Sequence, residues 1–151
     1  MRAIAVGLTA LALAGCGGRG APKTDADAVT QVLKDAAKAA ADGDGDKACS
    51  YLTPDAQSQA VLETASGTLG DTSCAQAVKR AQLVLTPLDK TRIKSLEPSN
   101  VRVNGTSASA TMASGSGADQ SQVISVQLNL QKVGSDWKIS GFVNQQGLPG
   151  G

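Results

Sequence analysis

Apolar residues change their spacing near residue 92, and this change constrains the fold more than any other feature of the sequence. Before this point, apolar side chains recur every three or four residues, as on one face of an α-helix. After it, they alternate with polar side chains, as in half-buried β-strands. Helices followed by strands predict an α+β domain, in which N-terminal helices pack on one face of a four-stranded antiparallel sheet.

Four helices are predicted in the first half of the chain. Thr24 and Ser73 each precede an acidic or amide residue at the third helical position, the pattern of a capping box, and Thr53 precedes a proline. The end of the last helix is ambiguous, because residues 83–85 are also compatible with a strand. The predicted helices cover 24–42, 46–52, 54–64 and a segment that opens at Ser73. The apolar face of the first helix carries Val29, Val32, Leu33, Ala36, Ala37 and Ala40 at helical spacing.

Four strands are predicted in the second half. The first includes Ile93, Ser95 and 101–103, and Asn104-Gly105 is a strong signal for a hairpin turn to the next strand. Loops are predicted at 66–72 and 114–120. The remaining inward positions alternate along three strands: Ala108, Ala110 and Met112, then Val126, Leu128 and Leu130, and finally Trp137, Ile139 and Val143.

The first sixteen residues have the arrangement of a secretory leader. A positive charge at Arg2 is followed by an apolar run over 3–12 and by Leu13-Ala14-Gly15-Cys16. A membrane-spanning helix is the weaker alternative, because only 16 uncharged residues stand between Ala3 and Gly18. A span needs about 20 predominantly apolar residues. The leader therefore predicts export from the cytoplasm.

Residues 13–16 resemble the lipobox of bacterial lipoproteins at all four positions. The resemblance implies that 1–15 are a cleaved signal peptide, that Cys16 carries a diacylglyceryl thioether, and that 16–23 hold the lipidated cysteine and a flexible tether. An ordinary signal peptide with a chance cysteine is the alternative. The expected location is the extracytoplasmic face of the cell membrane, with the outer membrane left open in a cell that has one.

Charge and cysteine usage extend this prediction. Cleavage removes Arg2 from 14 basic residues, leaving 13 against 13 acidic ones, so the acyl chains alone are expected to hold the protein at the membrane. Cys49 and Cys74 remain, and an oxidising compartment predicts that they form a structural disulfide, with free thiols or a redox pair as alternatives. The near-neutral charge argues against a nucleic-acid partner.

Several segments together resemble the nuclear transport factor 2-like superfamily, and specifically its small bacterial lipoproteins. They are a long first helix, Asp42-Gly43-Asp44, the residues 49–55, the second cysteine at a helix start, and the hairpin and terminal strands at 101–106 and 130–139. The resemblance covers 24–145 and leaves 146–151 as a disordered tail. It implies a cone in which a curved sheet wraps the long helix, often around an apolar pocket.

No reaction is predicted. The chain has no histidine, which removes histidine-based triads, general bases and zinc sites, and no catalytic residue carries over from the resemblance. Asp42, Asp44 and Asp46 resemble an extracellular calcium motif, but Lys47 and Ser50 stand where it has glycine and glutamate. A solvated turn that caps the next helix is therefore favoured, and neither metal nor cofactor is expected.

The sequence thus predicts a membrane-anchored, non-catalytic module. It leaves open a small apolar ligand, a protein partner, or a homodimer formed through the polar sheet positions Gln127, Asn129 and Gln131, whose replacement by lysine should abolish such a dimer. Alternatives are a purely structural envelope lipoprotein and an enzyme that uses Asp or Glu alone. Trp137 is expected in the core rather than stacked on a ligand.

Overall fold

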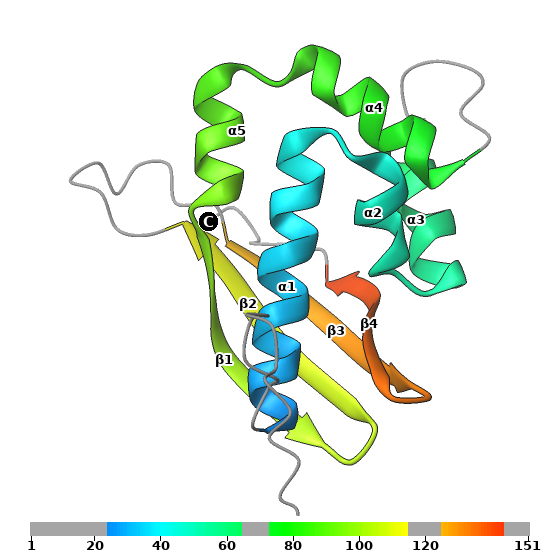
Figure 1. Cartoon of the computed structure of the whole chain (residues 1–151), viewed down its shortest axis with the longest axis vertical. Coiled ribbons are helices and arrows are strands. Elements are labelled where there is room, and N and C mark those ends of the chain that lie inside the picture. The colour runs from blue at the N-terminus through cyan, green and yellow to red at the C-terminus, as the bar shows by residue number, and fades with distance from the viewer. Residues whose placement is uncertain (1–23, 65–72, 115–124, 144–151) are drawn as a thin grey trace, which may run out of the picture.

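A computed structural model describes residues 24–64, 73–114 and 125–143. Several predicted segments lie outside these residues: the signal peptide, the lipidation site Cys16, the tether, the loop 66–72, all of the loop 114–120 except residue 114, and the tail 146–151. Helices come first and antiparallel strands follow (Figure 1), so the α+β class is confirmed. The helices are α1 (Asp25–Asp42), α2 (Gly45–Ser50), α3 (Pro54–Thr64), α4 (Cys74–Val84) and α5 (Pro87–Lys94).

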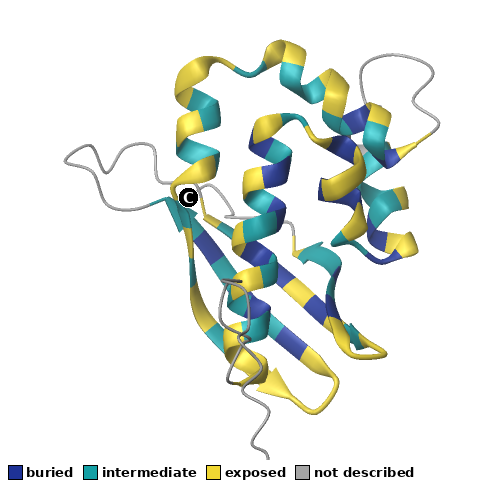
Figure 2. Cartoon of the chain, in the orientation of Figure 1, coloured by how far each residue is buried: buried dark blue, intermediate teal, exposed yellow. Residues whose placement is uncertain are grey.

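The strands form a single meander in chain order. They are β1 (Leu96–Asn104), β2 (Ser107–Ser114), β3 (Ser125–Val133) and β4 (Asp136–Val143), and the sheet order is β1-β2-β3-β4. Helix α1 crosses one face of the sheet (Figure 2). Buried residues of α1 and of the strands belong to one hydrophobic cluster. The opposite face carries exposed polar residues, including Gln127, Asn129 and Gln131, as predicted.

The first helix begins and ends where its sequence predicts. The Oγ1 atom of Thr24 accepts a hydrogen bond from the backbone N–H of Asp27 at 3.1 Å, which satisfies one of the free donors of the first turn. Gly43 ends the helix with a φ of 76°, a left-handed conformation that glycine adopts without a steric cost. Val29 and Leu33 on its inner face are among the most deeply buried side chains described.

Helix α5 corrects the prediction that Ile93 and Ser95 belong to the first strand. Thr86 and Asp89 form a reciprocal capping box, in which the Thr86 Oγ1 accepts from the Asp89 N–H and the Asp89 carboxylate accepts from the Thr86 N–H. Pro87 occupies the first helical position, where its missing N–H costs nothing. None of the α5 residues is fully buried, so the helix lacks the apolar periodicity that would have revealed it.

Strand β4 contains one extra residue, and this corrects the predicted orientation of Val143. The register shifts between Asn129 and Leu130 of β3, whose partners are Gly141 and Ile139, so Ser140 is bulged out of the pairing. Trp137 and Ile139 are buried as predicted. Beyond the bulge the alternation is inverted: Phe142 packs against the core, whereas Val143 is 37% exposed.

Cys49 of α2 and Cys74 of α4 form a disulfide, which confirms the predicted pairing. The two helices also approach closely at their backbones, because a Cβ atom added to Gly45 would lie 2.4 Å from the carbonyl oxygen of Ala75. A glycine is therefore required for this contact. The bridge and the close approach together fix α2 against α4.

The C-terminal end of α1 is held by ion pairs that depend on pH. Asp42 accepts from the Nζ atom of Lys38 at 2.7 Å and from that of Lys94 at 2.6 Å. These hydrogen bonds lower the pKa of Asp42 from 3.8 to about 2, and the bond from Lys38 contributes more than the bond from Lys94. The carboxylate therefore joins α1 to the end of α5.

We expect this joint to weaken in acid. A carboxyl whose pKa is lower in the folded protein stabilises the fold above its unfolded pKa, and the contribution is lost as the pH falls through the folded pKa. For Asp42 this loss extends from pH 3.8 down to about 2. As the pH is lowered through this range, the urea midpoint of unfolding should fall less steeply for Asp42→Asn than for the parent. If the two plots of midpoint against pH run parallel, the stabilising role of the Asp42 carboxylate is contradicted.

Candidate functional site

The candidate site is an apolar cavity of about 270 Å³ between the helices and the sheet. Each described helix and strand contributes at least one side chain to its lining, so the cavity depends on the whole fold. Helix α1 supplies Leu33, Ala36, Ala37 and Ala40. The other described lining residues are Ala48, Leu52, Ala60, Cys74, Val78, Ile93, Leu96, Met112, Val126, Leu128, Ile139 and Phe142.

Short side chains on the helices leave this space open. Ala36, Ala37 and Ala40 of α1 face the longer side chains of the strands, such as Met112 and Leu128, across the cavity. Because an alanine offers only a methyl group, the layers of the domain meet without filling the volume between them. The alanine-rich inner face of α1 is thus the local cause of the cavity.

The cavity has a buried floor and a more exposed rim. Leu33, Met112 and Leu128 are buried, while Val78 and Phe142 are half-buried. An apolar molecule that enters would therefore exchange contact with water for contact with aliphatic groups over most of its surface. Such burial is the main source of affinity for apolar ligands.

The lining offers no chemistry beyond apolar contact. Among the described lining residues, none carries a hydroxyl, amide or ionisable side chain. The one cysteine among them, Cys74, is bonded to Cys49 and does not titrate. A general acid, a general base or a nucleophile in this cavity would require an ionisable or hydroxyl side chain in the lining.

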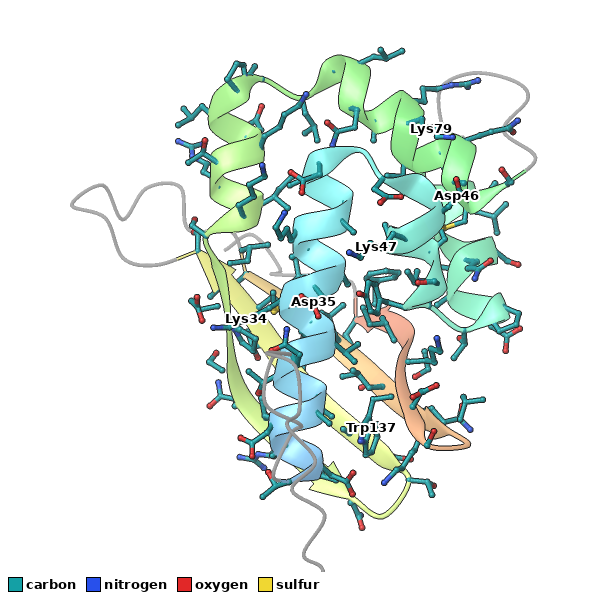
Figure 3. The ribbon with its side chains drawn as sticks, in the orientation of Figure 1. Lys34, Asp35, Asp46, Lys47, Lys79 and Trp137 are labelled. Atoms are coloured by element: carbon teal, nitrogen blue, oxygen red, sulfur yellow. A yellow bond between two sulfur atoms is a disulfide. The ribbon has the colours of Figure 1, made fainter. Side chains whose placement is uncertain are left out.

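A second hollow lies on the outer side of α1 and is polar. Its volume is about 400 Å³, and Lys34 and Asp35 of α1 border it (Figure 3). The lysines around it already bind carboxylates: Lys34 lies 2.6 Å from Glu97, and Lys94 lies 2.6 Å from Asp42. Because carboxylates of the same chain already pair with these lysines, we assign no ligand site to this hollow.

The three aspartates of the calcium-like segment do not converge. Asp42 binds Lys38 and Lys94, Asp44 caps α2 by accepting from the Lys47 N–H, and Asp46 lies 3.9 Å from Lys79 of α4. Within the described ranges, no group of three histidine, cysteine, aspartate or glutamate side chains could hold a metal ion. The segment serves as a turn that caps the next helix, as the favoured interpretation predicts.

Trp137 lies in the core, outside the described lining of the cavity. Its indole Nε1 donates to the Asp25 Oδ1 at 3.1 Å, and the Nζ of Lys132 binds the same oxygen at 2.8 Å. These bonds lower the pKa of Asp25, with the bond from Lys132 contributing most. Trp137 therefore connects β4 to the first turn of α1, which agrees with the predicted structural role (Figure 3).

The sequence predicts part of the lining. Five of the described lining residues are not predicted to face inward: Ala48, Leu52, Ile93, Leu96 and Phe142. Leu33 and Met112 were predicted to face inward, and both line the cavity. Ile93 was assigned to a strand and Phe142 was not assigned inward, although both line it as well. The capping box at Thr86 could have revealed Ile93, whereas no local signal marks the bulge that turns Phe142 inward.

Comparisons with known proteins establish no family. No protein-family model matches the chain, and no curated protein matches it. A similar solved structure is that of an NTF2-like protein with a cystatin-like fold from Novosphingobium aromaticivorans, with 13% identity, a TM-score of 0.48, and coverage of 82% of this chain and 84% of that chain. This similarity assigns neither a ligand nor an activity, and membership of the superfamily stays a prediction.

Membrane attachment is also a prediction. Among the helices in the described part of the chain, none is both long enough and apolar enough to cross a bilayer.

Proposed function

We propose that the protein is a non-catalytic binding module that holds a small apolar ligand in the cavity beneath α1. In this proposal Cys16 is lipidated and anchors the module at the extracytoplasmic face of the membrane. The cavity of about 270 Å³ with its apolar lining is the observation that carries the proposal. Binding sites for small molecules are typically concave, largely preformed and mostly apolar.

The size of the cavity limits the ligand. An apolar cavity of about 150 Å³ is large enough for benzene, so a cavity of this size would take about ten carbon atoms. Because the described lining has no hydrogen-bonding side chain, a buried polar group would lose its bonds to water without replacement. We therefore expect an aliphatic group to occupy the cavity and any polar end to remain at the rim.

The same lining supports a binding role over an enzymatic one. An enzyme that relies on carboxylates alone would need an Asp or Glu in its pocket with a raised pKa. The carboxyl groups with resolved shifts, those of Asp25, Asp42 and Asp89, all have lowered pKa values and lie outside the cavity lining. Their hydrogen-bond partners hold them in the charged form.

Binding can be tested with the methyl group of Met112 as a probe inside the cavity. In the chain from Gly17 to Gly151, Met112 is the single methionine, so one labelled methyl resonance reports on the lining. Addition of decanol should shift this resonance in a saturable way. Ala40→Phe should weaken binding at least about tenfold, because a ring of benzene size takes up about half of the volume.

The matched control is Ala26→Leu, which changes an exposed alanine on the same helix. It should bind decanol as the parent does. A Met112 resonance that does not respond to decanol, or equal affinities for Ala40→Phe and the parent, would contradict the proposed site.

A further inference from the structure

The chain is nearly neutral as a whole, but acidic residues predominate in the first three helices and basic residues in the last two. Residues 24–64, which form α1 to α3, hold eight acidic and three basic residues. Residues 74–94, which form α4 and α5, hold five basic residues and a single acidic one, Asp89. The two halves of the helical layer therefore carry opposite charge, and α4 and α5 are its basic part.

Large apolar side chains are exposed within this basic part. Leu83 is 84% exposed, Val84 is 80% exposed and Leu88 is 58% exposed. They lie where α4 ends and α5 begins, at the top of the view in Figure 1. We name these three residues the apolar corner. Large exposed apolar side chains that gather at one place on a surface indicate a contact with a partner or a membrane.

Helical spacing places basic side chains beside the apolar corner. Lys79 is one turn before Leu83 on the exposed face of α4, and Arg92 is one turn after Leu88 on α5. Lys79 has a carboxylate neighbour, Asp46, at 3.9 Å, but both side chains are largely exposed, so this pair is weak. Cationic and apolar groups thus share one surface.

We propose that the apolar corner and its surrounding basic residues bind the surface of an anionic lipid bilayer. Apolar side chains enter the boundary between headgroups and acyl chains, while Lys and Arg are attracted to the anionic headgroups. A nucleic acid would attract the cations but offers the leucines little apolar surface. This contact would supplement the acyl chains that were expected to act alone, and it does not depend on lipidation of Cys16.

The contact would set the orientation of the domain. The apolar corner lies beyond the C-terminal end of α1, whereas Thr24 lies at its N-terminal end, about 27 Å away for a helix of 18 residues. Residues 17–23 span at most about 25 Å when extended. A domain anchored at Cys16 can therefore reach the bilayer with its corner when α1 lies along the membrane surface.

Vesicle sedimentation tests the proposal directly. The chain from Gly17 to Gly151 contains every described residue and lacks both Cys16 and the leader. It should bind vesicles of equal parts phosphatidylglycerol and phosphatidylcholine, lose binding as salt is added, and bind phosphatidylcholine alone weakly. The double variant Leu83→Gln with Leu88→Gln should reduce binding about tenfold, because both changes remove apolar area that the bilayer would bury. Lys79→Gln with Arg92→Gln should reduce it by a similar factor.

Matched variants separate the corner from general effects. Leu62→Gln changes an exposed leucine of α3, and Lys47→Gln with Arg102→Gln removes the same charge elsewhere. Both controls should bind as the parent does, and Trp137 fluorescence checks that each variant is folded. The proposal is overturned by absence of binding to anionic vesicles, by equal binding to neutral ones, or by corner variants that bind like the parent. Self-association or duplex DNA binding in place of vesicle binding would also overturn it.

Discussion

Replacing both Cys49 and Cys74 with serine is expected to lower the free energy of unfolding by about 3–4 kcal/mol. The bridge joins residues separated by 25 positions and so restricts the unfolded chain over the whole of α3 and the adjoining segments. This loss is large relative to the stability that the core can supply. The chain has only one Trp, one Tyr and one Phe, and the core consists mainly of small aliphatic residues. Urea unfolding followed by Trp137 fluorescence measures the difference.

Reduction of the parent protein provides the control for this prediction. With the bridge reduced, the parent should unfold at nearly the same urea concentration as the double variant, because both lack the same cross-link. A double variant as stable as the oxidised parent would show that the bridge contributes little to folding.

Trp137→Ala is expected to destabilise the fold by about 3–5 kcal/mol, the usual cost of removing a large buried aromatic side chain. Trp137 is 3% exposed, and its ring belongs to the same buried cluster as Leu33 and Leu130. The variant also loses the hydrogen bond to Asp25 that holds the first turn of α1 near β4. Thermal unfolding followed by circular dichroism measures the effect without a tryptophan signal.

A smaller change at the same position separates packing from hydrogen bonding. Trp137→Phe keeps an aromatic ring in the core but cannot donate to Asp25, so it should cost less than the alanine variant. An alanine variant within about 0.5 kcal/mol of the parent, the range of an ordinary surface substitution, would contradict the assignment of Trp137 to the core.

The fold class follows from apolar spacing and capping residues because both are local properties. Leu33 on α1 and Leu128 on β3 follow the helical and strand periods, and Thr24 and Ser73 cap the helices that they were predicted to start. Helix α5 escaped this reasoning because none of its side chains is fully buried. Its capping box and the ion pair between Lys94 and Asp42 hold its two ends.

The cavity could be predicted only in part, since its volume depends on the distance between layers. The sequence indicates that Ala36 and Ala40 face inward, but an inward alanine can equally lie against a neighbouring backbone. The bulge at Ser140 decides that Phe142 rather than Val143 completes the lining, and alternation alone predicts the opposite. The basic residues of α4 and α5 can be read from the sequence, but the net charge of the whole chain, which is close to zero, does not reveal them.

The most direct test of the central claim is native mass spectrometry of Gly17–Gly151 exported into an oxidising compartment and then mixed with decanol. The proposed function predicts a chain two hydrogens lighter than its reduced mass, which carries one small apolar molecule from the host or takes up one decanol. Ala40→Phe should show a much smaller ligand-bound fraction than the parent in the same spectrum. A parent chain that has neither a bound molecule nor decanol, whether monomer or dimer, would contradict the claim that the cavity is a binding site.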